Sequence, residues 1–232
     1  MKEHFQDIVV PLLASPSNAK DKFRFIGSGF FVGSGGFLIT CRHVAEELAR
    51  GENLEAYQIG KRRSLGLKII DKSERYDLAL CKSINPPDIA ESWPIVTKPY
   101  VGLASEVYLS GYVYEPVEDD IPFRERYMKG YITGIAREII YKDSFELSFP
   151  VLFGMSGSPL LSRFRIEGDM EERIGIVGCA YGCHESSIVK HTVISTDNEI
   201  ERVSRIVELG LAHESETLIS ILAGSDIILD VF

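Results

Sequence analysis

Three short segments of the chain carry a histidine, an aspartate and a serine in settings that suit nucleophilic catalysis. His43 stands at the start of a predicted short helix, Asp77 precedes an apolar strand at 78–82, and Ser156 lies in a glycine-bordered turn. A serine hydroxyl is a weak nucleophile at neutral pH. A histidine can take its proton, and a carboxylate can orient that histidine and stabilise its charged form. The sequence therefore predicts an acyl-transfer site formed by these three side chains.

The turn around Ser156 also predicts a binding site for developing negative charge. A tetrahedral intermediate carries an oxyanion, which needs two backbone N–H groups aimed at one point. Gly154 can adopt backbone conformations that are closed to other residues, so its N–H and that of Ser156 can converge on one oxygen. Gly157 would let a substrate backbone come close.

The elements that must position these residues are mostly strands. Short runs rich in β-branched and aromatic residues recur between glycine, proline, asparagine and aspartate, which predicts a β-sandwich or barrel. The long helices that alternate with strands in a parallel α/β fold have no counterpart in this pattern. The predicted strands cover 23–32, 36–40, 54–59, 65–70, 78–82, 106–114, 127–141, 145–149, 174–181 and 188–195.

Two helices are expected. The first would run over 41–50, with Thr40 as its N-cap. The second would begin after Thr196 or Asp197 and end before Gly210. Its apolar residues fall at helical spacing: Ile200, Val203, Ile206 and Val207.

The three segments resemble those of the trypsin/chymotrypsin-like serine peptidases, especially bacterial HtrA-type and glutamyl-endopeptidase-type protease domains. Those families place Thr-x-x-His-Val first, then an Asp-(Leu/Ile/Val)-Ala-(Leu/Val) strand, then a Gly-x-Ser-Gly-(Gly/Ser)-Pro turn. This chain has the same order over residues 40–44, 77–80 and 154–159. The resemblance implies an all-β, chymotrypsin-like fold of two six-stranded antiparallel barrels with a C-terminal helix, and peptide-bond hydrolysis through an acyl-enzyme.

The resemblance also implies a role for each residue and a division of the chain. His43 would be the general base and then the acid, Asp77 would orient it, and Ser156 would be the nucleophile. The N–H groups of Gly154 and Ser156 would form the oxyanion hole. Residues 1–100 would form the first barrel with His43 and Asp77. Residues 101–210 would form the second barrel with Ser156 and the helix, and 211–232 would be a C-terminal extension.

Substrate binding is expected at Pro150, Cys179, Ala180 and Tyr181, which flank the nucleophile in the families that the chain resembles. Pro150 stands where a trypsin has an aspartate, so a preference for arginine or lysine is not expected. The histidine by which glutamyl endopeptidases recognise glutamate has no counterpart in the strand that begins near 174. A small or medium apolar side chain is the predicted preference.

The composition limits the partners of such a site. Lys plus Arg total 25 and Asp plus Glu total 34, which gives a formal charge of −9. Nucleic-acid binding rests on clustered positive charge, so no nucleic-acid partner is expected. No apolar run approaches the roughly 18–20 residues of a membrane span, and the short run 8–14 is interpreted as mature protein, so no membrane association is expected. The expected partner is a protein or peptide substrate.

The four cysteines predict thiols and a cytoplasmic location, because they are too few for a dense disulfide framework. They are Cys41, Cys81, Cys179 and Cys183. Cys179, Cys183 and His184 could be part of a metal site, but zinc usually needs four ligands with closer pairing. Neither a metal nor a cofactor is expected.

Departures from the family pattern leave two other functions open. Met155 stands where many relatives have aspartate or asparagine, and Cys41 and Arg42 replace small residues before the histidine. A degenerate peptidase fold could act as a peptide-binding module. The retained Met1, the cysteines interpreted as thiols and the apolar tail leave the second function open: a protease that stays inactive until a regulatory protein partner or a stress cue orders its loops. Singly, a core histidine, a strand-start aspartate and a turn serine are all common without catalysis.

Overall fold

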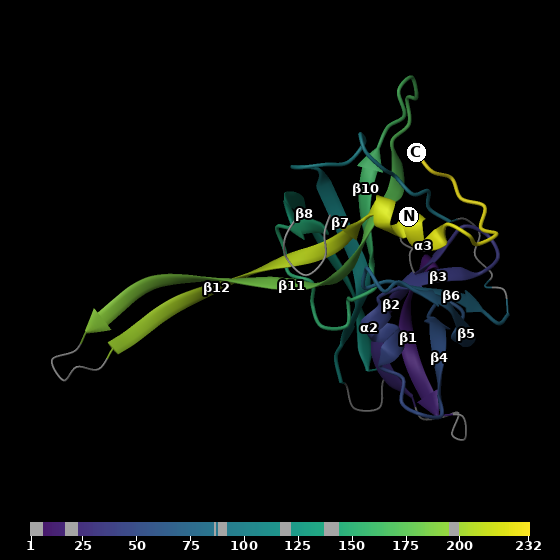
Figure 1. The fold of residues 1–232 in the computed structure, drawn as a ribbon, viewed down its shortest axis with the longest axis horizontal. Coiled ribbons are helices and arrows are strands. Elements are labelled where there is room, and N and C mark those ends of the chain that lie inside the picture. The colour runs from purple at the N-terminus through teal and green to yellow at the C-terminus, as the bar shows by residue number, and fades with distance from the viewer. Residues whose placement is uncertain are drawn as a thin grey trace.

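The strands of the protein close into two barrels (Figure 1). The computed structural model describes residues 7–16, 23–85, 87, 92–116, 122–136, 144–194 and 200–232, and of 136, 185–194 and 200–207 only the backbone. Each barrel has six strands, and every neighbouring pair is antiparallel. The expected all-β, chymotrypsin-like fold is therefore confirmed.

The first barrel has the strand order β1-β2-β3-β6-β5-β4. A short helix, α2 (Arg42–Glu46), follows β3 directly. The strands are β1 (Val9–Pro16), β2 (Arg24–Val32), β3 (Phe37–Thr40), β4 (Glu52–Gln58), β5 (Arg63–Lys72) and β6 (Ala79–Ser83).

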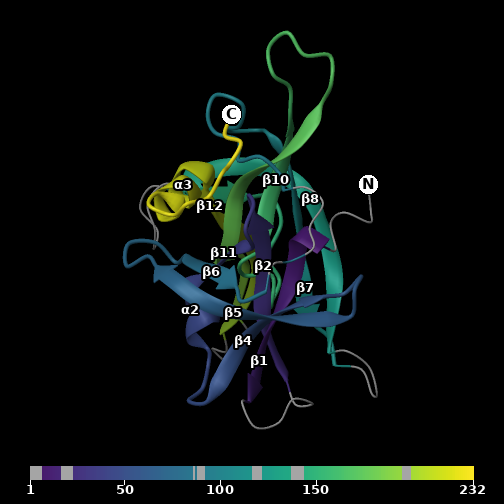
Figure 2. The same ribbon diagram turned by 90° about the vertical axis from the view of Figure 1, so that its right-hand side faces the viewer.

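The second barrel has the strand order β10-β11-β12-β9-β8-β7. A helix, α3 (Ser215–Leu222), follows β12 and packs against β11, β12 and β6 (Figure 2). The strands are β7 (Glu106–Tyr114), β8 (Phe123–Ala136), β9 (Ser144–Leu147), β10 (Pro159–Phe164), β11 (Arg173–Ile194) and β12 (Ile200–Glu214). The outer parts of β11 and β12 project far from both barrels as a two-stranded ribbon (Figure 1).

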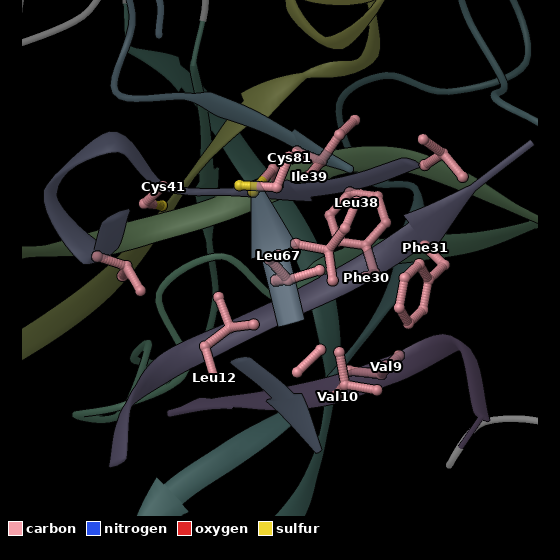
Figure 3. Close-up of a cluster of buried hydrophobic side chains, with 14 of the residues drawn as sticks. Val9, Val10, Leu12, Phe30, Phe31, Leu38, Ile39, Cys41, Leu67 and Cys81 are labelled. Atoms are coloured by element: carbon pink, nitrogen blue, oxygen red, sulfur yellow. The ribbon is translucent and has the colours of Figure 1, made fainter. Parts of the chain in front are cut away.

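The core of the first barrel fixes the strands that lead to His43. Leu12, Phe30 and Leu38 come from β1, β2 and β3, and all three are fully buried in one cluster (Figure 3). Burying each such side chain contributes about 1.5–3 kcal/mol. The same cluster continues to Tyr112 of β7 and Leu218 of α3, so the two barrels share part of their core.

The helix expected between 197 and 210 is wrong, because the described part of this segment, 200–210, belongs to strand β12. β12 pairs with β11 from Ile194↔Ile200 to Gly178↔Glu214. Its β-branched residues suit a strand at least as well as a helix, and the long partner strand decides between them. The two strands predicted at 174–181 and 188–195 are one continuous β11. The C-terminal helix is α3, and the second barrel runs past the expected boundary at 210.

Two further expectations change at the level of single elements, and a third lies partly outside the described residues. Thr40 does not cap α2. Its hydroxyl donates to Ser28 O at 2.7 Å, and Cys41 occupies the N-cap position without a side-chain hydrogen bond. Strands β1 and β10 were not predicted, because Pro11 interrupts the first and the second follows the Ser156 turn directly. Part of the predicted strand 127–141, residues 137–141, lies outside the described residues.

The C-terminal tail packs on the body of the molecule. Phe232 N donates to Ile95 O at 3.0 Å, and Thr97 N donates to Phe232 O at 2.8 Å. Ile95 also forms a bridge with Val231. No helix in the described residues has the length and apolar character that crossing a membrane would need.

Ser28 of β2 ties the first barrel to the turn that contains Ser156. Its backbone N–H donates to Ser156 O at 3.0 Å, and its hydroxyl donates to Gly154 O at 2.8 Å. Tyr112 N in turn donates to the Ser28 hydroxyl oxygen at 2.9 Å. Ser28 is fully buried, so each of these groups depends on it for its hydrogen bond.

We expect Ser28→Ala to lower the free energy of unfolding by about 1–3 kcal/mol, because it leaves the Tyr112 N–H and the Gly154 carbonyl unpaired in the interior. Urea denaturation measures this loss. Ser162→Ala is the matched control: the Ser162 hydroxyl is also buried, but it donates to Glu106 O within the second barrel alone. A smaller loss, near 1 kcal/mol, is expected there. Equal losses in the two variants would contradict a special role for Ser28.

Candidate active site

A cavity of about 370 Å³ lies where the two barrels meet. His43 lines it from the first barrel, and Ser156 lines it from the second. The rest of its lining is mostly apolar, with two carboxylates. These residues are Ile26, Glu47, Val151, Leu152, Phe153, Gly154, Gly182, Cys183 and Glu208.

His43 and Asp77 form a hydrogen-bonded pair. His43 lies on α2, whose position is set by β3, and Asp77 lies just before β6, the partner of β3. His43 Nδ1 is 2.5 Å from Asp77 Oδ2, and His43 N donates to Asp77 Oδ1 at 2.9 Å. The two contacts fix both the helix and the ring. The second ring nitrogen, Nε2, can then exchange a proton with another group.

The pairing shifts both pKa values. The hydrogen bond to Asp77 raises the pKa of His43 above 6.5, although burial opposes this shift. Burial alone would raise the pKa of Asp77, but the hydrogen bonds from the His43 ring and backbone outweigh it, so that the pKa of Asp77 is lowered. At neutral pH the aspartate is therefore ionised and can stabilise a protonated His43.

The Ser156 hydroxyl points elsewhere. It donates to the backbone oxygen of Tyr181 at 3.3 Å. Within the part of the chain that the structure describes, it makes no hydrogen bond to His43. A rotation about the Ser156 Cα–Cβ bond is the simplest motion that would redirect the oxygen, since serine side chains exchange between staggered rotamers.

Glycines shape the turn that holds Ser156. Gly154 has φ +94° and Gly157 has φ +87°, in the left-handed region that favours glycine. A Cβ on Gly154 would lie 2.5 Å from the Phe25 ring, and one on Gly157 would lie 2.1 Å from Ser28 O. The other N–H groups of the turn are used: Met155 N donates to Leu152 O, and Gly157 N to Ala180 O. The N–H groups of Gly154 and Ser156, expected as the oxyanion hole, have no acceptor among the described residues.

The residues expected to bind substrate do not line the cavity. Cys179 and Ala180 are fully buried, and Tyr181 is nearly so, because Cys179 and Tyr181 pack into the apolar cluster that the two barrels share and Ala180 packs into the cluster of the second barrel. Pro150 is also absent from the lining. The walls come instead from the residues just after these four, 151–153 and 182–183. Tyr181 reaches the site only through its backbone oxygen.

Met155 supports the turn from inside the second barrel. It is fully buried in the apolar cluster of that barrel. Ser158 N donates to Met155 O at 3.0 Å. The departure from the family's aspartate or asparagine therefore gives an apolar anchor to this turn.

Two important residues were missed by the sequence analysis. Ser28 lies in the glycine-bordered segment 27–29, and this pattern was the signal that could have found it. His213 of β12 is fully buried, stacks on Tyr181 with ring centroids 4.3 Å apart, and lies edge-on to Tyr76. Burial lowers the pKa of His213 to about 4, and the charge of Asp77 opposes this shift. No motif in the sequence marks this second histidine.

The four cysteines form no disulfide. Among the described residues, Cys179, Cys183 and His184 do not converge as metal ligands. The Cys183 sulfur contacts the backbone of Val151, and Cys179 points toward Ala180 O. One group of potential ligands does converge: Cys41, His43 and Asp77 have ligand atoms that all lie within 4.8 Å of one another.

The two closed antiparallel barrels have the serine-protease fold. The sequence model of the family described as "Trypsin-like peptidase domain" matches residues 27–164, which include His43, Asp77 and Ser156. The chain therefore belongs to the trypsin-like peptidase family. No curated protein matches its sequence.

Solved structures show the same fold. The HtrA-type protease AlgW, solved with a decapeptide, superimposes with a TM-score of 0.61 at 12% identity, over 95% of this chain and 64% of the AlgW chain. The MamO protease domain from Magnetospirillum magneticum in its apo form gives 0.58 at 15% identity, over 96% of this chain and 99% of that chain. The expected resemblance to HtrA-type peptidases is thus confirmed at the level of fold.

We expect Gly157→Ala to destabilise the protein far more than Gly168→Ala. Both glycines have φ +87°, so both alanines carry about 1–2 kcal/mol of backbone strain. Only at Gly157 does the new Cβ meet backbone, Ser28 O, whereas nothing lies within 4 Å at Gly168. Urea denaturation should show several kcal/mol of additional loss for Gly157→Ala, or no folded protein. Similar losses of unfolding free energy in the two variants would contradict a contribution of the close packing at Gly157 to stability.

Proposed function

We propose that the protein is a serine endopeptidase that hydrolyses peptide bonds through an acyl-enzyme. The observation that carries this proposal is the His43–Asp77 hydrogen bond at the wall of the same cavity as Ser156. Neutral His43 accepts the Ser156 hydroxyl proton at Nε2 while Oγ attacks the scissile carbonyl carbon. Asp77 stabilises the imidazolium that forms.

The rest of the cycle uses the same groups. The oxyanion accepts hydrogen bonds from the N–H groups of Gly154 and Ser156. The intermediate collapses as His43 returns the proton to the leaving amine. A water molecule then attacks the acyl-enzyme, His43 takes a proton from it, and the Ser156 hydroxyl is regenerated when the acid product leaves.

A peptide with an apolar side chain at the cleaved residue is the proposed substrate. The apolar lining of Ile26, Val151, Leu152 and Phe153 supports such a side chain. Glu47 and Glu208 line the same cavity, and their negative charge disfavours an acidic one. The decapeptide in the AlgW structure supports a peptide as the ligand of this fold. We keep a cytoplasmic location as part of the proposal, on the four cysteines without a disulfide.

The orientation of Ser156 supports two refinements. Its hydrogen bond to Tyr181 O must break before it can reach His43. A regulatory protein partner that shifts β11 would break this hydrogen bond. The proposed function therefore includes activation by a partner or a stress cue. The same contact favours the alternative function, a peptide-binding module that does not cut, since the hydroxyl is engaged away from the base.

We expect a fluorophosphonate probe to label the wild-type chain at Ser156, because only an activated serine attacks such a phosphorus centre at a useful rate. Ser156→Ala should lose labelling, and hydrolysis of apolar peptides should fall by about a millionfold. Equal labelling of the variant would refute the assignment. Absence of labelling together with tight peptide binding in both proteins would establish the binding module instead.

We expect kcat/KM to be lost as the pH falls through a midpoint above 6.5. The base must be neutral, and the hydrogen bond to Asp77 raises the pKa of His43 above its ordinary value. Asp77→Asn should move the midpoint downward and lower kcat by about 10⁴-fold. The pH profile of kcat/KM measures both effects.

Glu46→Gln is the control for this profile. Glu46 is exposed and raises the pKa of His43 only weakly through its charge. Its replacement should shift the midpoint far less than Asp77→Asn does. A wild-type midpoint below 6.5 would contradict the proposed hydrogen-bonded base.

A further inference from the structure

The proposed mechanism leaves one group beside the catalytic pair unused, the thiol of Cys41. This side chain is fully buried, and its sulfur donates to Ala180 O at 3.3 Å. The Cys41 sulfur, a ring nitrogen of His43 and a carboxylate oxygen of Asp77 all lie within 4.8 Å of one another. Cys41 stands where the families that the chain resembles have a small residue.

These three donors are the set that zinc prefers. Thiolate, imidazole and carboxylate bind Zn²⁺ at about 2.0–2.3 Å, whereas Mg²⁺ and Ca²⁺ prefer oxygen ligands. Ligand atoms around a tetrahedral zinc therefore lie roughly 3.5 Å apart. A zinc ion that enters between His43 Nδ1 and Asp77 Oδ2, now 2.5 Å apart, would spread these two atoms and draw the sulfur inward. Ala180 O, already beside the sulfur, or a water can be the fourth ligand.

The charges also suit a divalent cation. The Asp77 carboxylate accepts hydrogen bonds from the His43 backbone and ring, and it brings one negative charge. In the metal-free protein the Cys41 thiol carries a proton, which it donates to Ala180 O. Zinc binding would release that proton to solvent and form a thiolate, which balances the second positive charge.

The His43 ring offers a route into this buried position. Its side chain is 45% exposed, whereas that of Asp77 is 7% exposed. A swing of the ring toward the cavity opens the space between the two residues, and the ring can then close on the metal.

We propose that Cys41, His43 and Asp77 form an inhibitory zinc site that switches the active site off reversibly. Zinc on Nδ1 replaces the hydrogen bond that orients His43, and its positive charge makes Nε2 a poor base. The proposed inhibition by zinc rests on the proposed peptidase function, whereas zinc binding does not. Binding and inhibition are therefore tested by separate experiments.

Co²⁺ titration of the full chain tests binding directly. We expect one Co²⁺ per chain, with a near-ultraviolet thiolate-to-cobalt charge-transfer band, and competition by Zn²⁺. Cys41→Ser should abolish the band. Cys183→Ser should keep it, because Cys183 is the exposed thiol at the edge of the cavity. A band that survives in Cys41→Ser, or one that disappears in Cys183→Ser, would overturn the proposed site.

Zn²⁺ titration of fluorophosphonate labelling tests the consequence. Wild-type labelling at Ser156 should fall with Zn²⁺ and return with a chelator, and Cys41→Ser should need at least about tenfold more Zn²⁺. Even loss of a group that only orients a zinc ligand costs about 10–100-fold in affinity. Each variant is compared with its own zinc-free rate, and Cys41→Ala replaces Cys41→Ser if thermal unfolding shows the latter misfolded. Wild-type labelling that does not change with Zn²⁺ would refute the proposed inhibition by zinc. A cobalt band in a chain that is never labelled would refute only the peptidase function.

Discussion

The hydrogen bonds of Ser28 are the constraint on which the candidate active site depends. They join a strand of the first barrel to the turn of the second barrel that holds Ser156. Thr40 donates to the carbonyl of the same serine, three residues before His43. Gly157 packs directly on that carbonyl, where no side chain fits. One buried residue that takes no part in the proposed chemistry therefore holds the Ser156 turn against β2 and the end of β3.

The His43–Asp77 pair gives the site its electrostatic character. The hydrogen bond between the half-exposed His43 ring and the buried Asp77 carboxylate raises the pKa of the histidine and, against the effect of burial, lowers the pKa of the aspartate. In the proposed mechanism the Asp77 carboxylate stabilises His43 when the ring takes up a proton. In the proposed inhibited state a metal ion binds to both side chains instead. In that proposed state the Cys41 sulfur, which lies within 4.8 Å of the ring and carboxylate ligand atoms, would be the third protein ligand.

Local patterns of residue type and spacing predicted most of the strands. They failed where one pattern was compatible with two different structures. The β-branched residues at 200, 203, 206 and 207 have both helical spacing and strand propensity, and pairing with β11 made them a strand. Thr40 is a good helix cap by type, but a partner from β2 took its hydroxyl. The substrate-binding expectation named Pro150 and three residues of β11 whose side chains pack into the apolar core. The cavity is lined instead by residues 151–153 and 182–183.

The sequence by itself determined the chemical groups of the site, their order along the chain and the glycines of the turn, because these depend on residue type and on conformations that local chain sterics allow. The tertiary structure alone decided that His43 meets Asp77, that the Ser156 hydroxyl turns to Tyr181, and that a thiol lies beside the His43–Asp77 pair. The first two contacts join residues 34 and 25 positions apart, and Cys41 lies 36 positions from Asp77 although it is only two from His43. They follow from barrel closure and shared core packing, which no local sequence pattern contains.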